Sequence, residues 1–387
     1  MIASDSSQPE WEILCLSTRT ALDAAGAEHL RLLLGGEVKW DLLYRLARRH
    51  GVIALLYRTL SVYVSALPPA AWMEKLRREA LTHGKRNLLT AQELVRLLAL
   101  LARKGIPALA LKGPALAAIA YGDLALRQYG DLDILVHPQD VTLASEVLLN
   151  DAYFTDGTIL ESERPFGRRD GWVVVDLHWG VTVPHFASLL DEVGMWERAQ
   201  TISLAGGQVR TLALEDHLLA LAVHGCKDGW SRLKWVCDVA ELVDRHPLLD
   251  WESIQATAKA RGSLRLLWVA LALAEGLLGV TLPDPLRRRM ADDAAVARLA
   301  NQLAANLQRE EEPGVLARAL EEFTIQIRTL TGIRQRSAYI GYRLRLLLTP
   351  TAEDRSHLLL PGRLGALYYV TRPFRLVWSY GLSWLRA

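Results

Sequence analysis

Cysteine is scarce in this chain, and neither sign of charge is in excess. The 387 residues include only Cys15, Cys226 and Cys237, an odd number without a C-x-x-C spacing. This pattern indicates neither a disulfide framework nor a cysteine zinc site, and we expect buried free thiols. Lysine and arginine number 45 against 43 aspartates and glutamates. That balance argues against a dedicated nucleic-acid-binding protein.

Long apolar runs are also missing. A charge or a proline interrupts every stretch of the length that a membrane-spanning helix needs, so we expect no transmembrane span. Residues 1–9 are polar and lack the basic start and apolar core of a secretory signal, which favours a cytoplasmic protein. Half of the chain is nevertheless apolar, which predicts a substantial core in two or three domains.

Apolar residues recur at three- and four-residue spacing on both sides of the chain's centre, and this spacing predicts helices. The predicted helices cover 24–34, 40–63, 69–81 and 85–104 before the centre, and 214–226, 231–243, 251–261, 263–278, 285–307 and 315–330 after it. We therefore expect a helical N-terminal layer (1–104), a central core (105–205), a C-terminal helical domain (206–330) and a basic, aromatic segment (331–387).

Three aspartates stand in apolar runs of the central core. Asp131 and Asp133 lie two apart in one run, and Asp176 ends another. Side chains two apart in a strand share a face, so Asp131 and Asp133 can face one ion while the residues between and after them pack into the core. A carboxylate from an adjacent strand completes an all-oxygen ligand set for Mg²⁺. The alternative is a solvated strand edge, but carboxylates rarely enter apolar runs unless paired or metal-bound.

A strand followed by a glycine turn precedes these acids. The apolar run 106–111 is followed by Lys112, Gly113 and Pro114 and then by a helical stretch, 115–121. Backbone N–H groups at such a turn can face a phosphate, glycine permits close approach, and proline fits a first helical turn. The alternative is an ordinary strand-to-helix turn, for which the same residues suffice.

These residues together resemble a known family, the uncharacterised nucleotidyltransferases of the polymerase-beta-like superfamily. The resemblance lies in Leu111-Lys112-Gly113, Tyr121, Arg127, Asp131-Leu132-Asp133 and Val175-Asp176-Leu177-His178-Trp179. It continues in Glu215-Asp216-His217-Leu218-Leu219, His224, Trp230, Leu233-Lys234-Trp235 and Asp238. It covers most of residues 85–245.

The resemblance implies a helix-rich α+β fold in which a small polymerase-beta-like sheet is flanked by N-terminal and C-terminal helical domains. It implies that Gly113 lies in the loop that holds the nucleotide phosphates, that Asp131 and Asp133 bind two Mg²⁺ ions, with Mn²⁺ as a substitute, and that Asp176 completes the site. Family loops usually carry Gly-Ser or Gly-Gly. Pro114 has no N–H to donate, so the amides of Gly113 and Ala115 would contact the phosphates together with Lys112.

The reaction implied is transfer of a nucleoside monophosphate from an NTP, ATP in the first place, to an acceptor hydroxyl or phosphate with release of pyrophosphate. Relatives occur in ribosomal-peptide tailoring, including lasso-peptide pathways, so the resemblance suggests a modified peptide or a small molecule as acceptor. Which carboxylate acts as base stays open. Two alternatives are a non-catalytic nucleotide- or partner-binding module on the same fold and an antitoxin-like enzyme that modifies a partner protein.

Four further residues are candidates by position. Arg127 can neutralise a phosphate or pair with Asp131 or Asp123, and Lys234 stands where the superfamily often places a cation against the triphosphate. Asp238, four residues after Lys234, is expected to be its helix partner. His178 shares its side of the strand with Asp176, so it can orient that carboxylate or approach the nucleotide.

Other polar positions have less specific roles. His217 and His224 stand seven apart rather than the four typical of a zinc pair, which favours packing or hydrogen bonding. The polar stretch 156–171 is expected to form a hairpin or loop between the two acid-bearing strands, within reach of the acceptor.

The last sixty residues are basic. From Arg328 onward the sequence has ten arginines but only Glu353 and Asp354 as acids, and aromatic residues are interspersed among them. Such a segment can lie on a membrane surface, dock on a partner or bind an anionic substrate. The simplest alternative is a segment that wraps over the core with its arginines in solvent.

Overall fold

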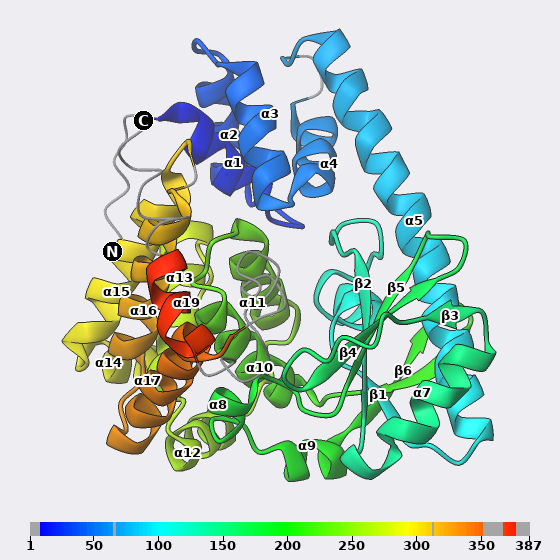
Figure 1. Ribbon diagram of the computed structural model, residues 1–387. Coiled ribbons are helices and arrows are strands. Elements are labelled where there is room, and N and C mark those ends of the chain that lie inside the picture. Colours follow the sequence, from blue (N-terminus) through cyan, green and yellow to red (C-terminus); the bar gives the residue numbers. More distant parts are fainter. Residues whose placement is uncertain (1–7, 65–66, 312, 351–366, 377–387) are drawn as a thin grey trace. The chain divides into compact units, whose positions relative to one another are not determined.

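The computed structural model describes residues 8–64, 67–311, 313–350 and 367–376. The chain divides into two compact units, Met1–Glu310 and Glu311–Ala387 (Figure 1). The first unit contains a seven-stranded mixed sheet and most of the helices, so the expected helix-rich α+β class is confirmed. None of the described helices is both long and apolar enough to cross a membrane.

Five helices precede the sheet. They are α1 (Pro9–Ser17), α2 (Ala24–Leu34), α3 (Trp40–His50), α4 (Ile53–Tyr63) and α5 (Ala70–Arg103). The prediction for 24–34 is confirmed, and the predicted helix 40–63 is divided at Gly51, which has a φ of 69°. The sequence patterns did not single out α1.

The segments 69–81 and 85–104 are helical as predicted, but the gap between them is wrong, because α5 is one helix of 34 residues that continues through Gly84. Glycine within a helix costs about 1 kcal/mol relative to alanine. Here the helix passes close to a loop, since a Cβ on Gly84 would lie 3.3 Å from the Cβ of Ala125. Just beyond, the Asn87 amide donates to the carbonyls of Leu124 and Arg127 at 2.6 and 2.8 Å, which fixes the loop against the helix.

The strands have the order β3-β4-β5-β2-β1-β7-β6 across the sheet. Their bounds are β1 (Ala108–Ala110), β2 (Asp131–Val136), β3 (Tyr153–Phe154), β4 (Glu163–Arg168), β5 (Val174–His178), β6 (Gln200–Leu204) and β7 (Gly207–Thr211). The central pair β2 and β5 is parallel, and β1 is antiparallel to β2. The polar stretch between the acid-bearing strands contains β4, which forms a hairpin with β5.

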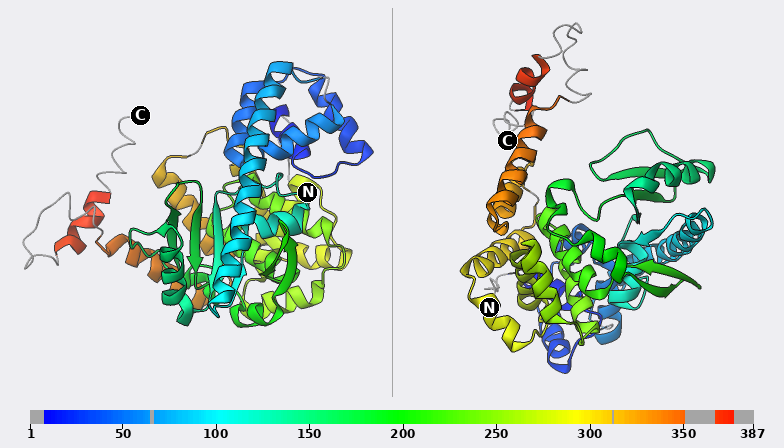
Figure 2. Two further views of the ribbon diagram at one scale, coloured as in Figure 1. Left: turned by 90° about the vertical axis from the view of Figure 1, so that its right-hand side faces the viewer. Right: turned by 90° about the horizontal axis from the view of Figure 1, so that it is seen from below.

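Short helical segments connect the strands. They are α6 (Gly113–Leu116), the π-helical turn η1 (Ala117–Tyr121), η2 (Pro138–Asp140), α7 (Val141–Asn150), α8 (Pro184–Ala187) and α9 (Glu192–Arg198). The helix α5 packs along β1, β6 and β7 (Figure 2).

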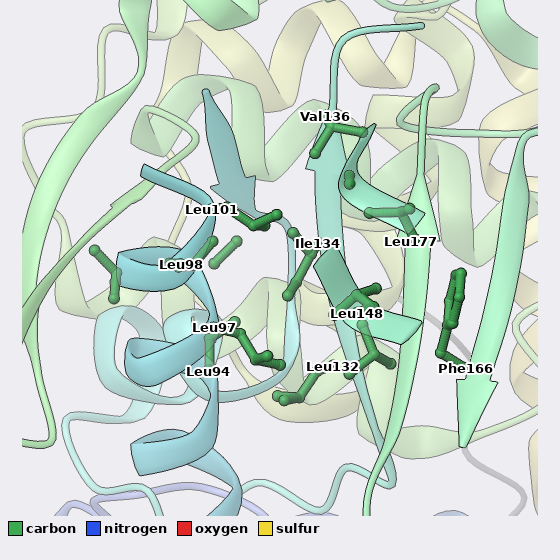
Figure 3. Close-up of a cluster of buried hydrophobic side chains, with 14 of the residues drawn as sticks. Leu94, Leu97, Leu98, Leu101, Leu132, Ile134, Val136, Leu148, Phe166 and Leu177 are labelled. Carbon is green, nitrogen blue, oxygen red and sulfur yellow. The ribbon is translucent and has the colours of Figure 1, made fainter. Parts of the chain in front are cut away.

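The two faces of the central strands differ sharply. Leu132, Ile134 and Leu177 are fully buried in a core formed with α5 and α7 (Figure 3). The intervening residues of β2 and β5, which include the acids, project from the opposite face because side chains alternate along a strand. The alternation predicted for Leu132, Ile134 and Val136 is therefore confirmed.

After the last strand, the described elements of the rest of the chain are helices, first in the first unit and then in the second. The first unit continues with α10 (Leu214–Lys227), α11 (Leu233–Arg245), α12 (Trp251–Arg261), α13 (Leu264–Leu278), α14 (Asp284–Ala291) and α15 (Ala294–Gln308). The second unit contains α16 (Val315–Thr329), α17 (Ile333–Leu348) and α19 (Tyr368–Leu376). Part of the predicted basic segment, including Arg355, Arg363, Trp378 and Arg386, lies outside the described residues.

Candidate active site

The three predicted acids come together on one face of the sheet. In the parallel pairing of β2 with β5, Asp133 lies directly opposite Asp176, and Asp131 stands two residues before Asp133 on the same face. Each strand exposes its carboxylates there because its apolar residues fill the core behind. The local alternation of the sequence and the register between strands together produce the cluster.

A cavity of about 250 Å³ lies over these acids. Its lining includes all three aspartates and is completed by residues of β4, α10 and α11. The lining residues are Lys112, Arg127, Tyr129, Asp131, Asp133, Ser162, Glu163, Asp176, His178, Val181, Thr182, Val183, His224, Lys227, Asp228, Lys234 and Trp235. Of the predicted site residues, the cavity lacks Gly113 and Asp238.

Four cationic side chains accompany the acids in this cavity. Lys112, Arg127, Lys227 and Lys234 line the same cavity from four segments of the chain. Burial lowers the pKa of Lys234, and the nearby charge of Arg127 lowers it further. The lining of the cavity therefore combines carboxylates and cations, which suits a ligand with both anionic groups and bound cations.

Arg127 is fixed by an ion pair that the sequence did not predict. Its Nε and Nη2 donate to the two carboxylate oxygens of Asp238 at 2.8 and 2.9 Å, and the Tyr121 hydroxyl donates to the same carboxylate at 2.8 Å. The expected pairing of Arg127 with Asp131 or Asp123 is wrong, and so is the expected partnership of Asp238 with Lys234. Asp238 is fully buried and does not line the cavity. It holds Arg127, which does, in place through their ion pair.

His178 connects two acids from different strands. Its Nε2 lies 3.1 Å from Oδ1 of Asp133, and its Nδ1 lies 3.2 Å from Oε2 of Glu163. The prediction that His178 orients a site carboxylate is correct in kind, but the partner is Asp133 on β2 rather than Asp176 on its own strand. Glu163, at the start of β4, thereby joins the site.

The charge states of the acids differ. Burial disfavours the ionised form of Asp133, but the charge of Lys112 and the hydrogen bond with His178 outweigh it, so the pKa of Asp133 lies well below its usual range. Burial and the neighbouring charges of Asp131, Asp133 and Glu163 raise the pKa of Asp176 to about 7. Around Asp176, the negative charge of the neighbouring acids therefore exceeds the positive charge of the nearby cations. A bound cation would reduce the repulsion between these acids.

The glycine loop approaches the acids through its backbone. Gly113 is buried with a φ of 52°, and a Cβ added there would lie 3.4 Å from the carbonyl oxygen of Asp131. This position therefore favours glycine because of its positive φ and close approach. Lys112, just before it, reaches the cavity, and its Nζ lies 3.2 Å from Nδ1 of His224.

The two histidines of α10 contact different partners, which agrees with the predicted packing or hydrogen-bonding roles rather than with a zinc site. His217 Nε2 lies 3.1 Å from the Thr211 hydroxyl beneath the sheet edge. His224 lines the cavity, and burial with the charges of Lys112 and Lys227 holds its pKa well below the usual value.

Two aromatic residues line the cavity, although the sequence analysis did not single them out as site residues. Trp235 and Tyr129 supply the aromatic surface of the lining, and the ring of Trp235 meets that of His224 edge-on at 5.6 Å. Trp235 follows Lys234 at the start of α11, so its place in the cavity depends on how α11 packs rather than on a local sequence signal.

The fit of the acids to a metal can be judged from their chemistry. Hard oxygen donors on one face and an excess of negative charge suit Mg²⁺. In the part of the chain that the structure describes, no group of three or more histidine, cysteine, aspartate or glutamate side chains is arranged so that it could hold a metal ion by itself. Magnesium sites in nucleotide-dependent enzymes commonly use one or two carboxylates and complete the coordination with substrate phosphates and water.

Comparison with known proteins gives one match. The family model described as uncharacterised nucleotidyltransferase matches residues 36–279, more than half of the chain. No curated protein and no solved structure matches the chain. The matched range contains the whole sheet and every residue that lines the cavity.

Proposed function

We propose that this chain, which belongs to the uncharacterised nucleotidyltransferase family, is a Mg²⁺-dependent enzyme that moves a nucleoside monophosphate from an NTP to an acceptor hydroxyl or phosphate. In the reaction an acceptor oxygen forms a bond to the α-phosphorus, and the bond from that phosphorus to the bridging oxygen of pyrophosphate breaks. The acceptor proton goes to a base in the site, and pyrophosphate leaves.

One observation carries the proposal: the carboxylates of Asp131, Asp133 and Asp176 line the same cavity as three lysines and an arginine. A triphosphate has four negative charges when fully ionised and travels with a divalent cation, so it needs both kinds of surface. An ordinary surface cluster would place the acids in solvent, whereas these acids stand on a sheet with a buried core behind them.

Asp131 and Asp133 would hold Mg²⁺ together with the phosphate oxygens, and Asp176 would complete the set. When bound, the ion lowers the pKa of the acceptor group and neutralises charge that develops on the pyrophosphate. Asp176, with a pKa near neutrality, can accept the acceptor proton at the same place. His178 and Glu163 keep Asp133 in orientation through the hydrogen bonds described above.

The cations would bind the triphosphate. Arg127 is held rigidly by Asp238, so it can meet a phosphate without losing side-chain freedom. Lys112, Lys227 and Lys234 add point charges around it. Trp235 and Tyr129 offer aromatic surface to a base. ATP is the nucleotide we expect first, and a modified peptide or a small molecule is the acceptor class.

The test is pyrophosphate release from each of the four NTPs with Mg²⁺, with extract of the source organism supplied as acceptor. We expect release with wild type and none with Asp131→Asn or Asp133→Asn, while Asp292→Asn, an exposed acid far along the chain, serves as the matched control. Labelled nucleotide would then appear on the acceptor. Release that persists without either carboxylate would contradict the proposal.

A non-catalytic binding module on the same fold gives a different result. Such a module would bind an NTP saturably in calorimetry but release no pyrophosphate with any acceptor fraction. An antitoxin-like enzyme would instead transfer the label to a co-purified protein. Pro114, which removes one amide donor from the loop, is the residue that favours the binding module.

A further inference from the structure

The second unit, residues 311–387, exposes apolar side chains along two of its helices. In α17, Ile333, Ile340, Leu344 and Leu347 recur at helical spacing, so they form one stripe. Ile333 is 81% exposed and Leu344 is 53% exposed. A neighbouring side of the helix packs inward, where the buried Tyr339 ring stacks on Phe323 of α16 at 5.6 Å. The stripe is therefore not the face by which α17 joins its own unit.

A second apolar stripe lies on α19. Val370 and Phe374 share one side of this helix by their spacing, Leu367 stands just before its first residue, and Phe374 is 73% exposed. The two helices belong to one structure, because Nη2 of Arg372 in α19 donates to the carbonyl of Leu346 in α17 at 3.1 Å. Exposed apolar patches on a folded unit commonly mark a surface that binds a membrane or another molecule.

Basic residues border the stripe of α17 on both sides. By helical geometry, Arg334 and Arg345 flank it on one side, and Arg336 and Arg343 flank it on the other. Two of them are also fixed to the unit, since Arg336 donates to the Leu330 carbonyl and Arg343 to the Ala319 carbonyl. No acidic residue occurs between positions 323 and 352 of the sequence. The surface therefore combines apolar side chains with charge of one sign.

From this combination we infer that the stripe of α17 and its flanking arginines form a peripheral binding surface for an anionic lipid bilayer. The leucines enter the boundary between headgroups and acyl chains, and the flanking arginines contact anionic headgroups. The chemistry disfavours other occupants. A nucleic acid would satisfy the arginines but leave the leucines in water. A second copy of the chain would bring like charges together.

The experiment is co-sedimentation of the full chain with phosphatidylcholine vesicles, with and without about 25% phosphatidylglycerol as the anionic lipid. We expect binding to the anionic vesicles, little binding to the neutral ones, and weaker binding when NaCl rises from about 0.05 to 0.5 M, because salt screens the arginines. Equal binding to both vesicles, or to neither, would overturn the inference.

Two double variants separate the apolar and the basic contributions. Leu344→Glu with Leu347→Glu should weaken binding by at least about tenfold, because the leucines no longer leave water. Arg334→Gln with Arg345→Gln should lower the partition coefficient about 25-fold, about fivefold for each arginine. Both pairs change exposed positions, and circular dichroism with a thermal melt would verify folding. If neither pair weakened binding, the inference would be wrong.

The matched control is Val193→Glu with Leu248→Glu, which places the same charges on exposed apolar positions of the first unit. This control should bind anionic vesicles nearly as well as wild type. Sedimentation equilibrium of the same proteins tests whether the surface instead binds a second copy of the chain. A dimer abolished by the leucine variant, without vesicle binding by wild type, would assign the surface to self-association instead. Binding of an oligonucleotide that the leucine variant retains, again without vesicle binding, would assign it to nucleic acid.

Discussion

Asp133 and Asp176 lie opposite each other on the parallel strands β2 and β5. The sheet thus holds two like charges side by side over a low-dielectric core, and Asp131 adds a third nearby. The electrostatic cost of ionisation differs between the two acids. Lys112 and His178 lower the pKa of Asp133, whereas the charge of His178 offsets only part of the rise in the pKa of Asp176. A site of this kind is poised to gain a cation and lose a proton together.

The first prediction concerns pH and Asp176. Its pKa rises from 3.8 to about 7 on folding, so the folded chain keeps a proton that the unfolded chain releases. The stability associated with this proton is complete below pH 3.8 and is lost as the pH rises through about 7. Asp176→Asn should therefore stabilise the metal-free protein relative to wild type at pH 8 but not at low pH.

Urea denaturation in EDTA across this pH range measures the effect. Asp292→Asn is the control and should show no such pH-dependent difference. In the same range, Mg²⁺ should stabilise wild type more at pH 8 than at pH 6, because binding must displace the proton below the pKa. An Asp176→Asn protein whose stability ran parallel to wild type at every pH would refute the raised pKa.

The second prediction concerns Glu163. This acid contacts His178, which in turn contacts Asp133. Glu163→Gln should leave the fold intact but lower kcat about 10- to 100-fold, as the loss of partners behind metal ligands commonly does. Its effect on the KM for NTP should be small, because Glu163 faces the acids rather than the cations.

Steady-state pyrophosphate release tests this split between kcat and KM. Glu161→Gln, two residues earlier and exposed, is the matched control. Apparent Mg²⁺ affinity is a second readout, and it should weaken only in Glu163→Gln. If Glu161→Gln lowered kcat as much, the hydrogen-bonded chain through His178 would not explain the effect.

Local patterns predicted that Asp131 and Asp133 share a face, but they did not predict the partners of the site residues. The face shared by Asp131 and Asp133 follows from the two-residue period of a strand, which the sequence carries directly. The contact between His178 and Asp133 joins residues 45 apart, and that between Arg127 and Asp238 joins residues 111 apart. Such contacts depend on strand order and helix packing, which no local spacing encodes.

The helices show the same division between local and tertiary causes. The segment 24–34 was predicted correctly because its apolar spacing is a local property of the sequence. The gap predicted between the helices near Gly84 was wrong. Glycine at this position lets α5 pass close to Ala125, and it does not end the helix. Likewise, the role of Asp238 could not be read from its place four residues after Lys234, since helix partners compete with buried partners from elsewhere.

The third prediction concerns the buried pair of Arg127 and Asp238. Asp238→Ala leaves the Arg127 guanidinium, which is 7% exposed, without its carboxylate. Removing one member of a buried ion pair costs about 3–5 kcal/mol of unfolding free energy. Tyr121→Phe removes one hydrogen bond to the same carboxylate and should cost only about 1 kcal/mol.

Equilibrium unfolding in urea compares these variants. A double variant, Arg127→Met with Asp238→Ala, should recover part of the loss, because the uncompensated charge is gone. It should still lack activity, since Arg127 lines the cavity. If Asp238→Ala and Tyr121→Phe cost the same, the ion pair would contribute nothing beyond its hydrogen bonds.

The fourth prediction concerns Glu93 of α5, away from the cavity. This buried acid accepts hydrogen bonds from Arg96, Arg168 and the Tyr153 hydroxyl, and so ties α5 to β3 and β4. Burial alone would raise the pKa of Glu93, but these partners outweigh it and lower the pKa to about 2. Because the folded pKa lies below the ordinary value of 4.5, the stabilisation is present above pH 4.5 and is lost as the pH falls through about 2.

Glu93→Gln should therefore destabilise the protein at pH 7 by about 1–3 kcal/mol, the cost of weakening hydrogen bonds to charged groups. The difference from wild type should shrink steadily below pH 4.5. Urea denaturation at pH 7, 4 and 3 measures it, with Glu28→Gln, an exposed glutamate of α2, as the control. A difference that stayed constant down to pH 3 would mean that Glu93 stabilises α5 by packing rather than by charge, because only the charge is titrated in this range.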